Sequence, residues 1–263
     1  MEYNLIGKML MEERNVKIYN AALEYLRSIK PQGVKLETYF IEKKRNYESL
    51  TDVYVRFIGS AQNYQAMPNI IGFYKRKEEF SSMLFDFDYV KIAELHEVDL
   101  YRSFRDSFHV TSKDTNRNCW FKWSRAVIDS AKFVSGFRDA EDFDTFVKRF
   151  DYNATSRMAL PLLIQAKIRG IGFALACDAL KELGYTDYSK PDVHLIDVFK
   201  EAGICEGNPV SVYEAISRMA DDCNETPYKV DKVFWLICSG NYYHDVIKEK
   251  SHKQELIALL KQI

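Results

Sequence analysis

Apolar residues recur every three to four positions along most of this 263-residue chain, the period of an amphipathic α-helix. The first expected helix covers residues 5–26 and stops before Pro31-Gln32-Gly33. Residues 38–41 are the one candidate strand. Further helices are expected over residues 49–66, 70–85, 142–150, 161–167, 173–183, 193–201, 210–221, 229–239 and 254–263. The pattern predicts an all-α fold.

Composition bounds the class of protein. With 47% apolar residues, the chain can bury one large core or form two closely packed lobes. It has no apolar run of 18 residues or more and no basic-then-apolar N-terminal segment. We therefore expect a cytoplasmic protein that neither enters a membrane nor is secreted.

The cysteines are scattered and form no Cys-x-x-Cys pair. They are Cys119, Cys177, Cys205, Cys223 and Cys238. This spacing argues against a disulfide framework, a zinc site and a Cys-ligated iron–sulfur cluster. There is also no Gly-rich nucleotide loop with its lysine, so we expect neither metal nor cofactor.

The formal net charge of −1 does not by itself indicate a nucleic-acid partner. The charge is unevenly distributed, however, because residues 78–99 are mostly acidic and residues 101–138 are mostly basic. The basic side chains of the second segment are Arg102, Arg105, Lys113, Arg117, Lys122, Arg125, Lys132 and Arg138, with Trp120, Phe121 and Trp123 among them. Such a segment is either an ordinary solvated face or a surface for double-stranded DNA.

The most informative motif is Gly170-Ile171-Gly172, which separates two expected helices and precedes Asp192. Glycines allow positive φ and close approach of the backbone to a ligand. The amide groups that open the next helix lack intrahelical partners and can point at a phosphate. Residues 159–184 therefore predict a helix-hairpin-helix that grips the DNA backbone.

The hairpin followed by Asp192, together with residues 58–63 and 232–240, resembles the helix-hairpin-helix DNA glycosylases, the superfamily of endonuclease III and 8-oxoguanine glycosylase. The resemblance implies a helical barrel lobe over residues 47–187. A second lobe would combine residues 1–46 with 188–263, and the active site would lie in the cleft between the lobes. The expected partner is double-stranded DNA, bound by a monomer.

The resemblance also implies roles for individual residues. Asp192 would stabilise the sugar cation that develops as an N-glycosidic bond breaks. Gln62 or Asn63 would fill the gap left by a flipped base. Arg169, Gly170, Gly172 and Lys122 would contact DNA, and Trp120, Trp123 and Trp235 would form the walls of the base pocket.

The chain departs from the family pattern at Ala174, where glycosylases that also cleave the strand carry a nucleophilic lysine. Alanine cannot form a Schiff base with the sugar. The resemblance therefore implies a monofunctional DNA glycosylase of base-excision repair, a hydrolase that removes a damaged or mismatched base, or a member without catalysis. Lys167 and Lys190 are close in sequence but not at the matching position, and we interpret both as surface charges.

Simpler structural roles stay open. Asp192 could act only as a helix N-cap, and His194 as a structural hydrogen-bonding residue. The tryptophans at helical positions could be core residues, and Gln62 and Asn63 could cap a helix or face solvent. A non-catalytic DNA-binding protein is the main alternative function, and an all-helical interaction protein is a third. The sequence does not indicate which base is recognised.

Overall fold

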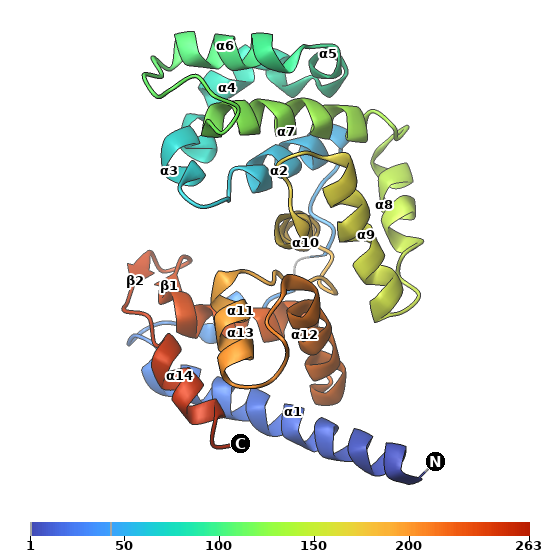
Figure 1. The fold of residues 1–263 in the computed structure, drawn as a ribbon, viewed down its shortest axis with the longest axis vertical. Coiled ribbons are helices and arrows are strands. Elements are labelled where there is room, and N and C mark those ends of the chain that lie inside the picture. The colour runs from blue at the N-terminus through green and yellow to red at the C-terminus, as the bar shows by residue number, and fades with distance from the viewer. Residues whose placement is uncertain (1, 43) are drawn as a thin grey trace. The chain divides into compact units, whose positions relative to one another are not determined.

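The computed structural model describes residues 2–42 and 44–263, and these residues are mainly helical, as the periodicity predicted (Figure 1). They form two compact units. One is continuous, Arg45–Leu183, and the other combines Met1–Lys44 with Gly184–Ile263. The boundaries expected from the sequence, residues 47 and 187, lie slightly later along the chain. Each unit has its own core.

The continuous unit is built around α7 (Cys119–Val134), which packs against α2 (Leu50–Ala61), α5 (Tyr89–Ala93) and α6 (Glu97–Ser107). Two helices carry the hairpin: α9 (Ala154–Lys167) and α10 (Phe173–Glu182), and α10 also packs against α2. The remaining elements are α3 (Met67–Ile71), η2 (Phe73–Arg76), α4 (Lys77–Met83), η3 (Phe85–Phe87) and α8 (Ala140–Lys148).

Aromatic side chains fill much of this core. The Phe80 ring lies edge-on to Trp123, with ring centroids 4.8 Å apart, and Phe104 packs against the same indole at 5.3 Å. Trp120 stacks on Phe108 at 5.0 Å, with 19° between the ring planes. Because large aromatic side chains bury much apolar surface, these contacts fix the position of α7 against α4 and α6.

In the other unit the long helix α1 (Glu2–Ile29) packs against α12 (Pro209–Cys223), α13 (Pro227–Ser239) and α14 (Lys253–Leu260) (Figure 1). Ile18, Ala22 and Leu26 bury one side of α1 in this core. The unit also contains η1 (Leu36–Tyr39), α11 (Val193–Glu201) and the short antiparallel pair β1 (Asn241–Tyr242) and β2 (Ile247–Lys248).

Several local predictions were wrong. Residues 38–41 are not a strand, because the segment forms the 3₁₀ helix η1 and buries Tyr39, whose hydroxyl donates to Asp245 Oδ2 at 2.7 Å. The helix expected over residues 49–66 ends at Ala61. The helix expected over residues 70–85 is divided at Gly72, whose φ of +62° ends α3 in the left-handed region.

Pro161 was expected in the first turn of a helix but lies inside α9, which starts at Ala154. The start is set by a reciprocal cap in which the Asn153 side chain accepts from the Ser156 N–H and the Ser156 hydroxyl accepts from the Asn153 N–H, both at 2.9 Å. The prediction that the helix starts at Pro161 was therefore wrong, because the Asn153–Ser156 capping pair starts it seven residues earlier, at Ala154.

Candidate functional site

The hairpin joins α9 to α10 in five residues. Ile168 and Ile171 are buried and anchor it, while Gly170 and Gly172 are exposed. The Leu175 and Ala176 N–H groups both donate to the Gly172 carbonyl oxygen, at 3.0 and 2.9 Å, and so begin α10. The amides at the very start of a helix have no intrahelical acceptor, so this end of α10 attracts anions.

The two glycines have different roles. Gly170 has a φ of +92°, and a Cβ built on it would lie 3.4 Å from both the Lys122 carbonyl oxygen and Ala126 Cβ. It therefore allows the turn to pack closely on α7. Gly172 has an extended backbone, with φ −82° and ψ 172°, and its Cβ would have no neighbour within 4 Å. Nothing within the fold requires glycine there, whereas the approach of a ligand backbone would.

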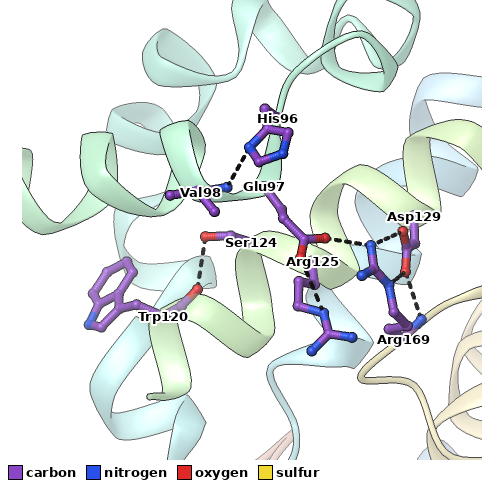
Figure 2. A network of polar contacts seen from close by, with 8 residues as sticks. All are labelled: His96, Glu97, Val98, Trp120, Ser124, Arg125, Asp129 and Arg169. Carbon is purple, nitrogen blue, oxygen red and sulfur yellow. Dashed lines mark hydrogen bonds and ion pairs between the residues drawn. The ribbon is translucent and has the colours of Figure 1, made fainter. Parts of the chain in front are cut away.

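Arg169 holds the hairpin in place (Figure 2). Its Nε and Nη2 donate to the two carboxylate oxygens of Asp129 at 2.6 and 2.8 Å, and its backbone N–H donates to Asp129 Oδ2 at 3.0 Å. Nη2 also lies 2.6 Å from Glu97 Oε2. These two carboxylates raise the pKa of Arg169. This guanidinium, for which a DNA contact was predicted, ties the hairpin to α7 and α6.

Lys122 lies on the part of α7 that faces the hairpin, with its carbonyl oxygen 3.4 Å from a Cβ built on Gly170. Its ammonium is 5.6 Å from the centroid of the Tyr64 ring, which brings the loop after α2 to the same surface. In that loop Tyr64 and Gln65 are exposed, and Gln65 adopts a φ of +50°. These two residues were not singled out from the sequence, although the hydrophilic turn after the 58–63 segment was a signal for them.

Gln62 does not fill the expected role of a polar plug. Its side chain is buried, and its Oε1 accepts the Phe73 N–H at 2.9 Å. The sequence could not show this, because Phe73 becomes its neighbour only after the chain turns back at Gly72. Asn63 is partly buried and donates to Asp178 Oδ2 at 3.4 Å.

The prediction that Trp120 and Trp123 line a base pocket is corrected by their burial. Trp123 is fully buried, and its indole N–H donates to the Ile58 carbonyl oxygen at 2.9 Å. Trp120 is buried against Phe108. Both are core residues of the continuous unit. Trp235 differs, because it lies on α13 of the other unit and is only partly buried.

Asp192 is the N-cap of α11. Its Oδ1 accepts from the His194 N–H at 2.9 Å and from the Leu195 N–H at 3.3 Å. No described residue donates to Oδ2. The capping role considered from the sequence is therefore present, and one carboxylate oxygen is still available.

The electrostatic setting of Asp192 differs from that of a simple cap. Burial raises the pKa of its carboxyl, and the Asp231 carboxylate raises it further, whereas Lys190 and the Leu195 N–H act in the opposite direction. Asp231 is itself buried and accepts the Lys190 N–H at 2.7 Å. Backbone donors alone would lower the pKa, so dehydration and the second carboxylate outweigh the cap.

The remaining candidate residues lie close in sequence to the hairpin or to Asp192. Ala174 lies in the first turn of α10 and offers no amine. Lys167 ends α9 and is exposed, as expected of a surface charge, whereas Lys190 is partly buried and acts on Asp192. His194 has a buried Nδ1 without a partner among the described residues.

Within the described part of the chain, no three His, Cys, Asp or Glu side chains gather as a metal site would require. The cysteines are free, with Cys177 and Cys238 buried. In the same residues no helix is long and apolar enough to span a membrane.

A comparison with solved structures identifies the type of fold. The chain is similar to the 8-oxoguanine glycosylase/lyase of Methanocaldococcus jannaschii, solved in complex with a 15mer DNA containing 8-oxoguanine. The TM-score is 0.54 at 14% sequence identity, over 86% of this chain and 98% of the other. The fold is that of a helix-hairpin-helix DNA glycosylase. No protein-family model and no curated protein matches the sequence.

Proposed function

We propose that this protein is a monofunctional DNA glycosylase, which hydrolyses the N-glycosidic bond of a damaged or mismatched base in base-excision repair. The observation that carries the proposal is Asp192, a partly buried carboxylate with one oxygen free, placed after a helix-hairpin-helix of the glycosylase fold. The chain would act as a monomer on double-stranded DNA.

The proposed DNA surface of the continuous unit joins three features. The N-terminus of α10 supplies backbone amides beside the exposed Gly172, and Lys122, on the part of α7 against which Gly170 packs, supplies a cation. Tyr64 and Gln65 project from the neighbouring loop and are the candidates to fill the space of a flipped base. This assignment moves the residue that fills the space two or three positions along the chain from Gln62.

The proposed chemistry uses the charge of Asp192. As the base leaves, positive charge develops on the sugar ring, and the free carboxylate oxygen stabilises it more than it stabilises the uncharged substrate. The same oxygen accepts a proton from the water that attacks C1′. Because Ala174 offers no amine, no covalent Schiff base forms at that position, and the product is an intact strand with an abasic site.

The test is base release from duplexes that carry single lesions. Asp192→Asn keeps the capping oxygen but removes the charge, so it should reduce release by about 10²–10³-fold or more while duplex affinity is kept. Asp197→Asn is the matched control, because Asp197 lies on the same helix and is paired with Lys253 Nζ at 2.7 Å. It should leave release unchanged.

The products separate the mechanisms. Strands should break only after alkali, and borohydride should trap no covalent adduct. A trapped adduct would show that an amine such as Lys190 acts as a nucleophile. Full release by Asp192→Asn would reduce Asp192 to a helix cap.

A non-catalytic DNA-binding protein is the second candidate. It is favoured by Ala174, which offers no amine at the start of α10, and by the capping bonds of Asp192, which would give that carboxylate a role without catalysis. Tight, salt-dependent binding to duplexes without release of any base would support it.

A further inference from the structure

The fold separates the cations of the basic segment, residues 101–138, into those that it uses itself and those that it does not. Three of its arginines, Arg105, Arg125 and Arg138, interact with acceptors of the fold. By contrast, Lys113 and Arg117 are exposed, and neither makes an ion pair with a carboxylate of the described residues. These two cations are therefore available to a ligand.

Both cations belong to the loop that joins α6 to α7, which we call the α6–α7 loop, residues 108–118 (Figure 1). The buried side chain of Asn118 holds this loop. Its Nδ2 donates to Ser112 Oγ and to the Lys113 carbonyl oxygen, both at 2.9 Å, and its Oδ1 accepts the Trp120 N–H at 2.9 Å as the N-cap of α7. The loop is thus fixed to the start of α7.

The hairpin packs against the same end of α7. A Cβ built on Gly170 would lie 3.4 Å from the Lys122 carbonyl oxygen, and Lys122 follows the Asn118 cap by only four residues. Four residues advance an α-helix by about 6 Å. The loop that carries Lys113 and Arg117 therefore lies next to the hairpin, with Lys122 between them.

The surface around the start of α7 carries more positive than negative charge, although the whole chain has a formal charge of −1. Residues 105–122 contain four cations and two carboxylates, namely Arg105, Lys113, Arg117 and Lys122 against Asp106 and Asp114. The excess is present with both carboxylates ionised, so the argument does not need an isolated charge. A region with this balance attracts phosphates.

A DNA strand that is held at the hairpin brings its next phosphates to the α6–α7 loop. Successive phosphates of one strand are about 3.4 Å apart along the duplex axis, so the loop is only a few nucleotides from the hairpin. Because the backbone of the loop is already fixed by Asn118, binding has to order little more than the Lys113 and Arg117 side chains.

We propose that the α6–α7 loop is a second phosphate-binding element, in which Lys113 and Arg117 bind the DNA backbone on the flank of the nucleotide that the hairpin presents. This inference rests on the proposed function for its partner, duplex DNA. Contacts to phosphates carry no sequence information, so the loop acts in the same way whichever base is removed.

The first experiment measures duplex affinity by fluorescence anisotropy over a salt series. Lys113→Met and Arg117→Met should each lower the slope of log affinity against log salt by about 0.9 and weaken binding by about fivefold to tenfold at 0.1 M salt. Lys132→Met is the matched control, because Lys132 is an exposed cation of the same segment in the last turn of α7. It is about 20 Å along the helix from Asn118, beyond the screening length of about 10 Å, so its slope should equal that of the wild type.

The second experiment places the contact on the duplex. The lesion stays fixed while the duplex is shortened from one end or from the other. The wild type should lose affinity when the flank that reaches the α6–α7 loop is removed, whereas the double variant Lys113→Met/Arg117→Met should lose none at that step. A loss that depends on the loop cations and on one flank cannot come from general attraction between the protein and a polyanion.

Wild-type salt slopes in both single variants, an equal change in Lys132→Met, or the same truncation loss in the wild type and the double variant would each overturn the inference. Base release is measured separately. Release by the wild type with unchanged slopes in the variants would refute the loop contact and leave the proposed glycosylase standing. Lower slopes without release of any base would support the loop contact and refute the glycosylase.

Discussion

The two hairpin glycines should respond in opposite ways to substitution, which separates a role in folding from a role in DNA binding. Gly170→Ala places a Cβ at φ +92° and against the backbone of α7. Gly172→Val places a larger side chain on an extended backbone that faces open space. The first change should lower stability, and the second should lower affinity for duplex DNA.

The magnitudes follow from the geometry. An L-residue in the left-handed region costs about 1–2 kcal/mol, offset by about 0.4–1 kcal/mol from the lower entropy of the unfolded chain. Gly170→Ala should therefore destabilise by about 1 kcal/mol and lower Tm by about 2–4 °C. Gly172→Val should destabilise less than Gly170→Ala, because valine adopts this extended backbone without strain and its Cβ meets no neighbour.

For binding, a side chain at Gly172 keeps a phosphate from the amides of α10. Loss of one hydrogen bond to a charged group costs about 1.5–3 kcal/mol, which predicts about tenfold weaker binding or more. The slope of log affinity against log salt should stay the same, because no cation is removed.

The measurements are thermal unfolding and fluorescence anisotropy with a labelled duplex over a salt series. Gly170→Ala should keep wild-type affinity at temperatures well below its Tm. The reasoning is refuted if Gly172→Val binds as tightly as the wild type, or if it unfolds as early as Gly170→Ala.

Three further predictions concern charge and the loop after α2. Arg169→Met should destabilise by about 1–3 kcal/mol in thermal unfolding without reducing the salt slope of binding, and a slope lower by about one would reveal a phosphate contact instead. Asp192 acts when ionised, so base release should be lost as pH falls through its raised pKa. Asp231→Asn removes one cause of the raised pKa, so the acid limb of the pH–rate profile should move to lower pH. Gln65→Ala should weaken binding of a duplex with a flipped base while Gln62→Ala mainly lowers Tm, and the reverse result would restore Gln62 as the plug.

The raised pKa of Asp192 also affects the stability of the fold as pH changes. A carboxyl whose pKa is higher in the folded than in the unfolded chain destabilises the fold where it is ionised. For Asp192 this penalty is fully present above the raised folded pKa and disappears as pH falls below the ordinary value of about 3.9. Asp192→Asn should therefore leave Tm unchanged or raise it at neutral pH, and a large fall in Tm would contradict the sign.

The all-α class and the hairpin were predictable because they depend on local patterns. Helical periodicity and the Gly-x-Gly turn can be recognised from residues that lie close together in the sequence. The boundaries at Ala61 and Gly72, and the helix η1 in place of a strand, depend on caps and distant partners such as Asp245 for Tyr39. A pattern of apolar positions does not contain those partners.

The candidate site shows the same limit. Asp192 could be named from the motif, but its partner Asp231 is 39 residues away and meets it only in the folded unit. Trp120 and Trp123 looked identical to Trp235 in the sequence, since an aromatic residue at a helical position gives no sign of which neighbours will cover it. Arg169 was indistinguishable from a phosphate-binding arginine until Asp129 came within 2.6 Å.

The division of one unit between the two ends of the chain has a consequence for synthesis on the ribosome. The continuous unit can fold once Leu183 has emerged, but the partners of α1 on α12, α13 and α14 are made last. At about 5–20 residues per second, the apolar side of α1 that carries Ile18 and Leu26 waits about 10–40 s for them. During that interval the nascent chain exposes the apolar side of α1 to chaperones and to neighbouring chains. The folding yield should therefore depend on how well chaperones keep about the first thirty residues from aggregating.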